Sequence, residues 1–382
     1  MHFPNAIKIP FNKPHFTGKE AYHVAAAATS GKISGNGQFT QKCHEFFRQR
    51  YGFGKVLLTT SCTDALEMSA LLARIEPGDE VILPSYTFVS TANAFVLRGA
   101  KLVFADSNPE NPNIDTSKIE GLISSKTKVI VVVHYAGIAC YMDEVMQLAS
   151  RYKLLVIEDA AHSIDSFYKN QPLGSIGHMA AFSFHETKNI SCGEGGMLVV
   201  NDTNIAPRAE IIWEKGTNRA AFYRGEVDKY GWVDIGSSFL PSDMAAAFLL
   251  GQLDLLDEIQ QKRKEIFNSY FNLLKPLQQS GNIQLPVIPE YATSNGHLFY
   301  IVTNDTIERE KLIRHLNEQG IQAVFHYLPL HLSPYFKDKY TGLPLPLAEH
   351  YADCLLRLPL YYDLSFEGIE MVVNSISGFY KG

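Results

Sequence analysis

The chain has 382 residues, of which 46% are apolar and 19% charged, an ordinary balance for a globular protein. Its formal net charge of −6 gives no support for a nucleic-acid-binding surface, which needs an excess of basic residues. No apolar run reaches the roughly 18–20 residues of a transmembrane helix, and residues 1–14 have no signal-peptide core. The five cysteines form no CxxC pair, so we expect no disulfide framework, no metal site and a cytoplasmic location.

From about residue 40 to residue 200, short apolar runs alternate with stretches of helical spacing. Each run is continuously apolar rather than alternating, which is typical of strands buried on both faces. Helical stretches between them indicate βαβ units, and we predict an α/β fold with a mostly parallel sheet. The predicted strands are 55–59, 80–83, 101–104, 128–133, 154–157, 180–184 and 197–200.

Residues 244–277 are predicted to form one long amphipathic helix that is broken by Pro276. A strand at 298–302 and a helix at 308–319 follow it. This change of pattern indicates a second, smaller unit. We therefore expect a large α/β domain at residues 1–250 and a small α+β domain at 251–382.

Polar segments follow three of the predicted strands, at the edge where open α/β sheets bind ligands. Asp159 follows the strand at 154–157, Lys188 follows the strand at 180–184, and Thr63 lies where a helix begins after 55–59. A lysine can hold an aldehyde as a Schiff base, a carboxylate can keep a pyridine nitrogen protonated, and a helix N-terminus binds phosphate. Each residue alone is more often a solvated or capping side chain, but together they suit pyridoxal 5'-phosphate (PLP).

Five segments carry a family resemblance, at residues 84–93, 157–162, 183–189, 193–196 and 327–331. With them, the chain resembles the fold-type I, PLP-dependent sugar-nucleotide aminotransferases over nearly its whole length. The resemblance implies the aspartate-aminotransferase-like PLP-dependent transferase fold, with a seven-stranded, mostly parallel sheet in the large domain. It also implies a homodimer whose active site lies at the subunit interface.

The resemblance implies a role for each matching residue. Lys188 would carry PLP and move the proton, and Asp159 would pair with the pyridine nitrogen. The further cofactor-binding positions would be Phe88 on the ring, His162 near the phenolic oxygen, and Ser183, Thr63 and Asp64 at the phosphate. The candidate substrate contacts are Asn189, Arg219, Arg224, Lys229, Tyr327 and His331. Many relatives have an Asn from the neighbouring subunit at the phosphate, where this chain has Leu240.

The segments 215–219 and 224–230 are most similar to members that transfer an amino group from L-glutamate to C4 of dTDP-4-keto-6-deoxy-D-glucose. We expect this reaction, with a 3-keto isomer, the C4-epimeric amine or a UDP-linked sugar as alternatives. A PLP sugar dehydratase is disfavoured because such relatives have His in place of Lys188. A non-catalytic PLP-binding regulatory protein is the alternative from another class. A nicotinamide-dependent oxidoreductase is disfavoured because no glycine fingerprint follows the first strand.

Overall fold

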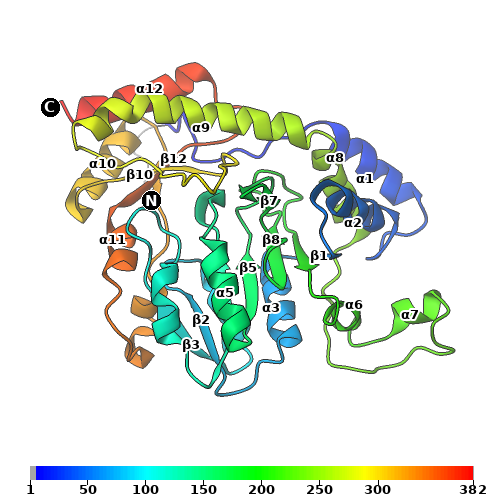
Figure 1. Cartoon of the computed structure of the whole chain (residues 1–382). Helices are drawn as coiled ribbons and strands as arrows, with labels where there is room; N and C mark the ends of the chain where they lie inside the picture. The colour runs from blue at the N-terminus through cyan, green and yellow to red at the C-terminus, as the bar shows by residue number, and fades with distance from the viewer. Residues whose placement is uncertain (1–5, 382) are drawn as a thin grey trace.

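The computed structural model describes residues 6–381, and its centre is a seven-stranded sheet (Figure 1). The strand order is β1-β9-β8-β5-β4-β2-β3. Strand β9 is antiparallel to both of its neighbours and every other pair is parallel, which confirms the expected mostly parallel sheet. The strands are β1 (Lys55–Thr59), β2 (Glu80–Pro84), β3 (Lys101–Ala105), β4 (Thr127–Val133), β5 (Leu155–Asp159), β8 (Met179–Ser183) and β9 (Gly196–Val200).

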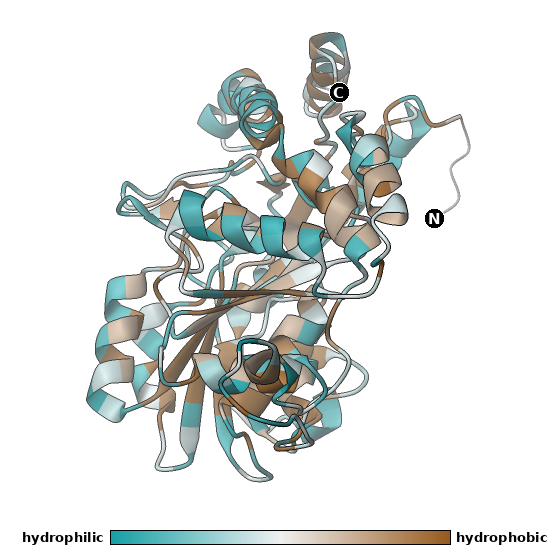
Figure 2. Cartoon of the chain, turned by 90° about the vertical axis from the view of Figure 1, so that its right-hand side faces the viewer, coloured by the Kyte–Doolittle hydropathy of each residue, from teal (hydrophilic) through white to brown (hydrophobic). Residues whose placement is uncertain are grey.

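The strands are continuously apolar because helices cover both faces of the sheet. Val131 and Ile157 pack toward one set of helices, whereas their neighbours Val132 and Val156 pack toward the other set. Figure 2 shows brown strands in the interior and helices of mixed teal and brown around them. The first face is covered by α3 (Cys62–Leu72), α4 (Val89–Val96) and α6 (Ala206–Trp213). The second is covered by α5 (Met142–Tyr152), α2 (Gln38–Tyr51) and α8 (Asp243–Leu253).

A second, antiparallel sheet lies beside the first and has the strand order β10-β12-β11. One of its faces packs on three helices that form the core of the C-terminal part. Residues near the N-terminus join this part, because Ile9 forms a parallel bridge with Ile321. The predicted boundary between a large domain at residues 1–250 and a small domain at residues 251–382 stays a prediction. The elements are β10 (Phe299–Val302), β11 (Val324–Phe325), β12 (Leu355–Leu358), α9 (Leu256–Gln279), α10 (Thr306–Glu318) and α12 (Phe366–Phe379).

The prediction of one helix over 244–277 is wrong, because the structure has two helices, α8 and α9, separated at Asp254 and Leu255. Leu255 has non-helical dihedral angles of φ −122° and ψ 22°. The apolar periodicity continues through the break, since Leu253 and Leu256 are both buried, so spacing alone does not reveal it. The turn lets α8 lie beside α2 while α9 extends to the second sheet (Figure 1). Pro276 does not break α9, because it lies close to the C-terminal end, where the helix continues for three more residues.

The N-terminus of α2 is held by a carboxylate from another helix. Asp243 is fully buried and accepts hydrogen bonds from Phe39 N (3.1 Å), Thr40 N (2.8 Å) and Thr40 Oγ1 (2.7 Å). Gly37 permits this approach, since a Cβ there would lie 2.3 Å from the carboxylate. The negative charge also opposes the partial positive charge of the helix end.

Replacing Asp243 by alanine is expected to lower the free energy of unfolding by about 3–5 kcal/mol, because three buried donors lose their acceptor. Ser242→Ala is the matched control, since it removes one capping hydrogen bond, to Ala245 N at 3.3 Å, and should cost about 1 kcal/mol. Urea unfolding of both variants measures the difference. Equal losses in the two variants would contradict the role of Asp243.

Candidate active site

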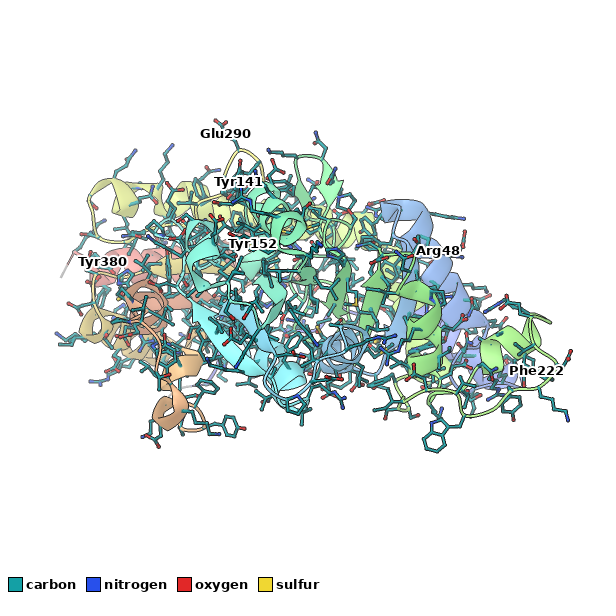
Figure 3. All side chains as sticks on the ribbon, turned by 60° about the horizontal axis from the view of Figure 1, so that its bottom comes forward. Arg48, Tyr141, Tyr152, Phe222, Glu290 and Tyr380 are labelled. Atoms are coloured by element: carbon teal, nitrogen blue, oxygen red, sulfur yellow. The ribbon has the colours of Figure 1, made fainter. Side chains whose placement is uncertain are left out.

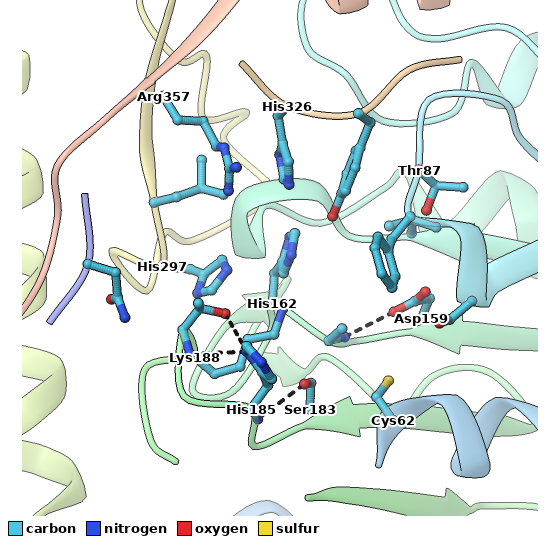
Figure 4. Close-up of a pocket in the computed structure, with 18 of the residues that line it drawn as sticks. Cys62, Thr87, Asp159, His162, Ser183, His185, Lys188, His297, His326 and Arg357 are labelled. Carbon is cyan, nitrogen blue, oxygen red and sulfur yellow. Dashed lines mark hydrogen bonds between the residues drawn. The ribbon is translucent and has the colours of Figure 1, made fainter. Parts of the chain in front are cut away.

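A cavity of about 790 Å³ lies between the carboxyl ends of β5 and β8, the N-termini of α3 and α4, and the second sheet. It gathers residues that lie far apart in the sequence (Figure 4). The predicted site residues that line it are Thr63, Phe88, Asp159, His162, Ser183, Lys188 and Tyr327. Within residues 6–381, no three His, Cys, Asp or Glu side chains are grouped as a metal site requires, and no helix is long and apolar enough to cross a bilayer.

Lys188 lies in the loop after β8, where its backbone N–H donates to His185 O at 2.9 Å in a tight turn. Among the described residues, its Nζ has no hydrogen-bonding or ion-pair partner. Burial lowers the pKa of Lys188 to about 8, and the nearby positive charge of Arg357 acts in the same direction, against the charge of Asp159. A substantial fraction of the side chain is therefore a neutral, nucleophilic amine near neutral pH.

Asp159 ends β5 and turns its carboxylate into the cavity. Its Oδ2 accepts from Thr91 Oγ1 at 2.7 Å, and its Oδ1 accepts from Ala161 N at 3.2 Å. Burial raises the pKa of Asp159, although the Thr91 hydrogen bond, the Ala161 N–H and the charge of Lys188 act in the opposite direction. A positively charged ring nitrogen beside this carboxylate would supply the partner that its burial leaves missing.

The preceding residue, Glu158, has a different role. Successive side chains of a strand point to opposite faces of the sheet, so its carboxylate points away from that of Asp159. Its fully buried carboxylate accepts from Gly174 N (2.7 Å), Ile176 N (2.9 Å) and Gly177 N (2.6 Å). His134 Nε2 is a fourth partner at 2.9 Å. Its acceptor positions are used within the protein, so Glu158 organises this loop and Asp159 is the carboxylate that faces the cavity.

The first turn of α3 offers N–H groups that have no partner within the helix, at one wall of the cavity. Ser61 caps the helix by accepting from Asp64 N at 3.1 Å, and Thr63 Oγ1 lies 2.8 Å from Ser90 Oγ at the start of α4. Gly196 brings the helix close to the sheet, because a Cβ there would lie 2.3 Å from the Ser61 backbone. Asp64, predicted at the phosphate, does not line the cavity and accepts from Thr60 Oγ1.

Aromatic rings form the side walls of the cavity. Phe88 is 55% exposed, and its ring centroid lies 6.2 Å from that of Tyr327. His162 is stacked on His297 with a centroid distance of 4.2 Å, and its Nδ1 accepts from Ala136 N at 3.2 Å. Burial lowers the pKa of His162 well below its usual range, so the ring is neutral and carries its proton on Nε2.

Two of the predicted substrate contacts lie outside the cavity lining. Asn189 is buried, and its amide binds Gln260 Oε1 (2.8 Å), Asn295 O (3.0 Å) and His297 Nδ1 (2.8 Å). His331 is also buried, with Nδ1 2.7 Å from Ser85 Oγ. Both side chains are engaged by the protein, so their substrate roles remain predictions without support from this geometry.

The three predicted basic contacts also lie away from the cavity, on or after the short helix α7 (Arg219–Tyr223). Arg219 stacks on Tyr223, and Arg224 forms ion pairs with Glu226 (2.7 Å) and Glu210 (2.9 Å). Lys229 is exposed. Residues 219–232, which we call the α7 segment, project from the body of the molecule (Figure 1), and Phe222 stands at the extremity of this segment (Figure 3). Leu240 stands where many relatives have an Asn at the phosphate, and here it packs against the core of its own chain.

Sequence reasoning missed four residues at the site. Thr91 binds Asp159, whereas His297, His326 and Arg357 line the cavity from the second sheet and its loops (Figure 4). Arg357 alone left a signal, as the single charge in the apolar run of β12. The other three look like ordinary helix or loop residues in the sequence.

The side chains around the cavity match the chemical groups that PLP needs from a protein. PLP needs an amine for its aldehyde, an anion for its ring nitrogen and N–H groups for its phosphate. Lys188, Asp159 and the first turn of α3 meet these needs around one cavity. The fold and the cavity thus define the class, a fold-type I PLP-dependent enzyme.

Comparison with known proteins defines the chain further. The chain belongs to the DegT/DnrJ/EryC1/StrS aminotransferase family, which matches residues 14–377. The spore coat polysaccharide biosynthesis protein SpsC of Bacillus subtilis is 32% identical over 98% of this chain and 97% of its own length. The crystal structure of S. venezuelae DesV has a TM-score of 0.90 and 28% identity, covering 99% of this chain and 100% of its own.

A similar structure bears on the cofactor. Spr1654 of Streptococcus pneumoniae, a candidate sugar aminotransferase solved in its PLP form, has a TM-score of 0.89 and 26% identity, covering 98% of both chains. The protein described here is a PLP-dependent sugar aminotransferase with the fold-type I architecture.

The lowered pKa of Lys188 has a kinetic consequence. Between pH 6 and pH 8 the neutral fraction of an amine of pKa about 8 rises about 50-fold, and it levels off above about pH 9. We expect the rate at which the apo-enzyme takes up PLP, measured by absorbance, to follow this curve, with N-acetyl-lysine followed in parallel as the ordinary amine. A rate that still climbs steeply near pH 10, as for an ordinary lysine, would contradict the lowered pKa.

Proposed function

We propose that this enzyme transfers the amino group of L-glutamate to C4 of dTDP-4-keto-6-deoxy-D-glucose. The products are 2-oxoglutarate and dTDP-4-amino-4,6-dideoxy-D-galactose, as for the dTDP-4-amino-4,6-dideoxygalactose transaminase of the enterobacterial common antigen pathway. The choice of sugar is supported by the likeness at segments 215–219 and 224–230. The relative SpsC, named for polysaccharide biosynthesis, supports a pathway to a polysaccharide.

The observation that carries amino transfer is the placement of Lys188 Nζ in one cavity with the Asp159 carboxylate, with a lowered pKa and no bonding partner within residues 6–381. When bound, PLP withdraws electrons from the carbon that carries the amino group. Lys188 Nζ accepts the proton from Cα of glutamate and, in the second half-reaction, delivers a proton to C4 of the sugar. Asp159 holds the positive charge on the ring nitrogen, and Phe88 covers the ring.

The remaining predicted residues have supporting roles in this proposal. The first turn of α3, with Thr63 and Ser183, holds the phosphate, and His162 donates from Nε2 to the phenolic oxygen. Tyr327 contacts the sugar from the second sheet's side. Its backbone has a positive φ of 46°, which is uncommon for a residue with a side chain and is typical of functional sites.

The enzyme is proposed to act in the cytoplasm as a homodimer with active sites at the subunit interface. Support comes from the projecting α7 segment, in which Trp232 is 84% exposed and Tyr223 69% exposed. Such rings gain stability when a second copy covers them. In a dimer this segment would bring Arg219, Arg224 and Lys229 to the nucleotide diphosphate in the partner's cavity. Light scattering should give twice the chain mass of 42.7 kDa.

The test of function follows the visible absorbance of the PLP-loaded enzyme in two additions. L-glutamate should remove the band of the bound cofactor, and dTDP-4-keto-6-deoxy-D-glucose should then restore it. Ring proton couplings of the isolated product distinguish the galacto amine from its C4 epimer. Loss of the band without recovery would leave the aminotransferase in place and reject this sugar, and the UDP-linked and 3-keto sugars would then be added in the same way.

A further inference from the structure

A second cavity lies away from the active site, beside the residues that follow the α7 segment. Its volume is about 290 Å³, and it shares no lining residue with the active-site cavity. The N-termini of α3 and α4 wall the active site, whereas this second pocket lies at the C-terminal ends of the same two helices. Helix α6 contacts both α3 and α7 (Figure 1). The pocket is lined by Leu71, Arg74, Ile75, Glu76, Arg98, Arg208, Asp234 and Ile235.

Three arginines from separate parts of the chain meet in this pocket. Arg74 follows α3, Arg98 follows α4, and Arg208 lies in α6. The guanidinium of Arg208 is satisfied by the protein. Its Nε and Nη2 lie 2.7 Å and 3.3 Å from the two carboxylate oxygens of Asp234, and its Nη1 donates to Leu71 O at 2.7 Å.

The guanidinium groups of Arg74 and Arg98 are not satisfied in this way. Among residues 6–381, neither group has a hydrogen-bond acceptor or an ion-paired carboxylate. The Nε of Arg98 is buried without an acceptor. The hydrogen bond from Arg208 lowers the pKa of Asp234, and the charge of Arg74 acts in the same direction, so the charges of both arginines reach this carboxylate.

The helix ends account for only part of this positive charge. Cations are favourable at the C-terminus of a helix, and Arg74 and Arg98 follow two such ends. The carbonyl at the end of α3 that accepts from a guanidinium is Leu71 O, and its donor is Arg208. Glu76 is the second acid of the lining, but it is exposed and forms no ion pair within the described part of the chain. Two carboxylates thus face three guanidinium groups, and two of those groups have free N–H donors.

We propose that Arg74 and Arg98 bind the phosphate group of a small molecule in this pocket. A carboxylate matches one guanidinium, as Asp234 matches Arg208. A phosphate group has three terminal oxygens and a charge of about −1.5 to −2 at neutral pH, so it binds two guanidinium groups at once. The volume is close to the lower end of small-molecule sites, about 300–1,000 Å³, which leaves room beside the phosphate.

The ligand of this pocket is distinct from the cofactor and from the substrates, because the pocket and the active site have separate linings. Free inorganic phosphate and a phosphate monoester of a small metabolite share the chemistry that the two arginines recognise. The site depends on the placement of the arginines and not on which sugar the enzyme aminates.

Phosphorus NMR titration of the PLP-loaded enzyme tests the site with two probes, inorganic phosphate and glycerol 3-phosphate. Loading with PLP fills the phosphate position of the cofactor itself. Two charge-assisted pairs correspond to a Kd of about 1 mM for the better probe. Arg74→Gln and Arg98→Gln should each weaken binding about tenfold. Glu76→Gln should strengthen binding about threefold, because it removes a negative charge from the edge of the pocket.

Two further arginines provide matched controls. Arg309 also has a buried Nε without an acceptor, and Arg314 is exposed like Arg74, but neither lines either cavity. Arg309→Gln and Arg314→Gln should keep the wild-type affinity for both probes. All five variants should retain wild-type kcat, which also verifies that they fold, because none of these residues lines the active site.

Each result decides for or against the phosphate site. Tighter binding of glycerol 3-phosphate indicates a monoester as the ligand, and equal binding of the two probes indicates free phosphate. Unchanged affinity in both Arg74→Gln and Arg98→Gln overturns the proposal, as does an equal loss in the two controls, which would indicate general attraction to the charge of the enzyme. Succinate should bind at least about tenfold more weakly than phosphate, and equal affinity would replace the phosphate by a carboxylate. A wild-type enzyme that binds neither probe below about 10 mM would also overturn the site.

Discussion

Lys188→Ala is expected to lower kcat by at least about 10⁵-fold, because the variant loses both the amine that carries PLP and the group that moves the proton. Borohydride treatment of the PLP-loaded variant should leave no cofactor covalently attached, whereas wild-type enzyme should be labelled on Lys188. Added methylamine should restore part of the activity by replacing the missing amine in the cavity.

Lys126→Ala is the control for Lys188, because Lys126 is exposed and lies outside the cavity. It should retain wild-type kcat and labelling. The assignment of Lys188 fails if Lys188→Ala turns over at the wild-type rate, or if borohydride attaches the cofactor to another lysine.

Asp159→Asn should lower kcat about 10³-fold while PLP still binds. The amide keeps the size of the side chain and can still accept from Thr91, but it has no charge to hold the ring nitrogen protonated. N1-methyl-PLP carries a fixed positive charge on that nitrogen, so it should recover much of the lost activity in this variant. Single-turnover rates with each cofactor measure both effects.

Variants at two residues near Asp159 distinguish the effect of its charge from the effect of its orientation. Thr91→Val removes the hydrogen bond that orients the carboxylate and should lower kcat about tenfold. Glu158→Gln should reduce stability more than chemistry, because Glu158 accepts three backbone N–H groups away from the cavity. Full activity of Asp159→Asn with ordinary PLP would contradict the role at the ring nitrogen.

The positions of Lys188 and Asp159 could be predicted because they depend on a local rule. Each follows a buried strand, and the carboxyl ends of parallel strands meet at one edge of a sheet. The strands themselves were predictable to within one or two residues, since burial on both faces requires continuous apolar runs. The family resemblance then assigned chemistry to these residues, and the structure shows that their strands, β5 and β8, are neighbours in the sheet.

Residues whose environment comes from distant segments could not be placed in this way. Asn189 follows Lys188 directly and was expected at the sugar, yet its amide binds residues of α9 and of the loop before β10. Arg219, Arg224 and Lys229 were expected near the diphosphate but lie on the projecting α7 segment. Their surroundings depend on how the chain folds back and, in the proposed dimer, on a second copy.

The sequence by itself determined the strands, the polar residues at their ends and the kind of cofactor they suit, because continuous apolar runs and the residues that follow them are local properties of the sequence. Only the tertiary structure decided which of those residues face one cavity, that α8 and α9 separate at Asp254 and Leu255, and that Arg357 lines the site with no ion-paired carboxylate among the described residues. The physical reason is that a side chain's partners, and hence its pKa and its freedom to bind a ligand, come from segments that lie far away in the sequence. Phe11 and Arg357, joined over the cavity from the two ends of the chain, are one such pair.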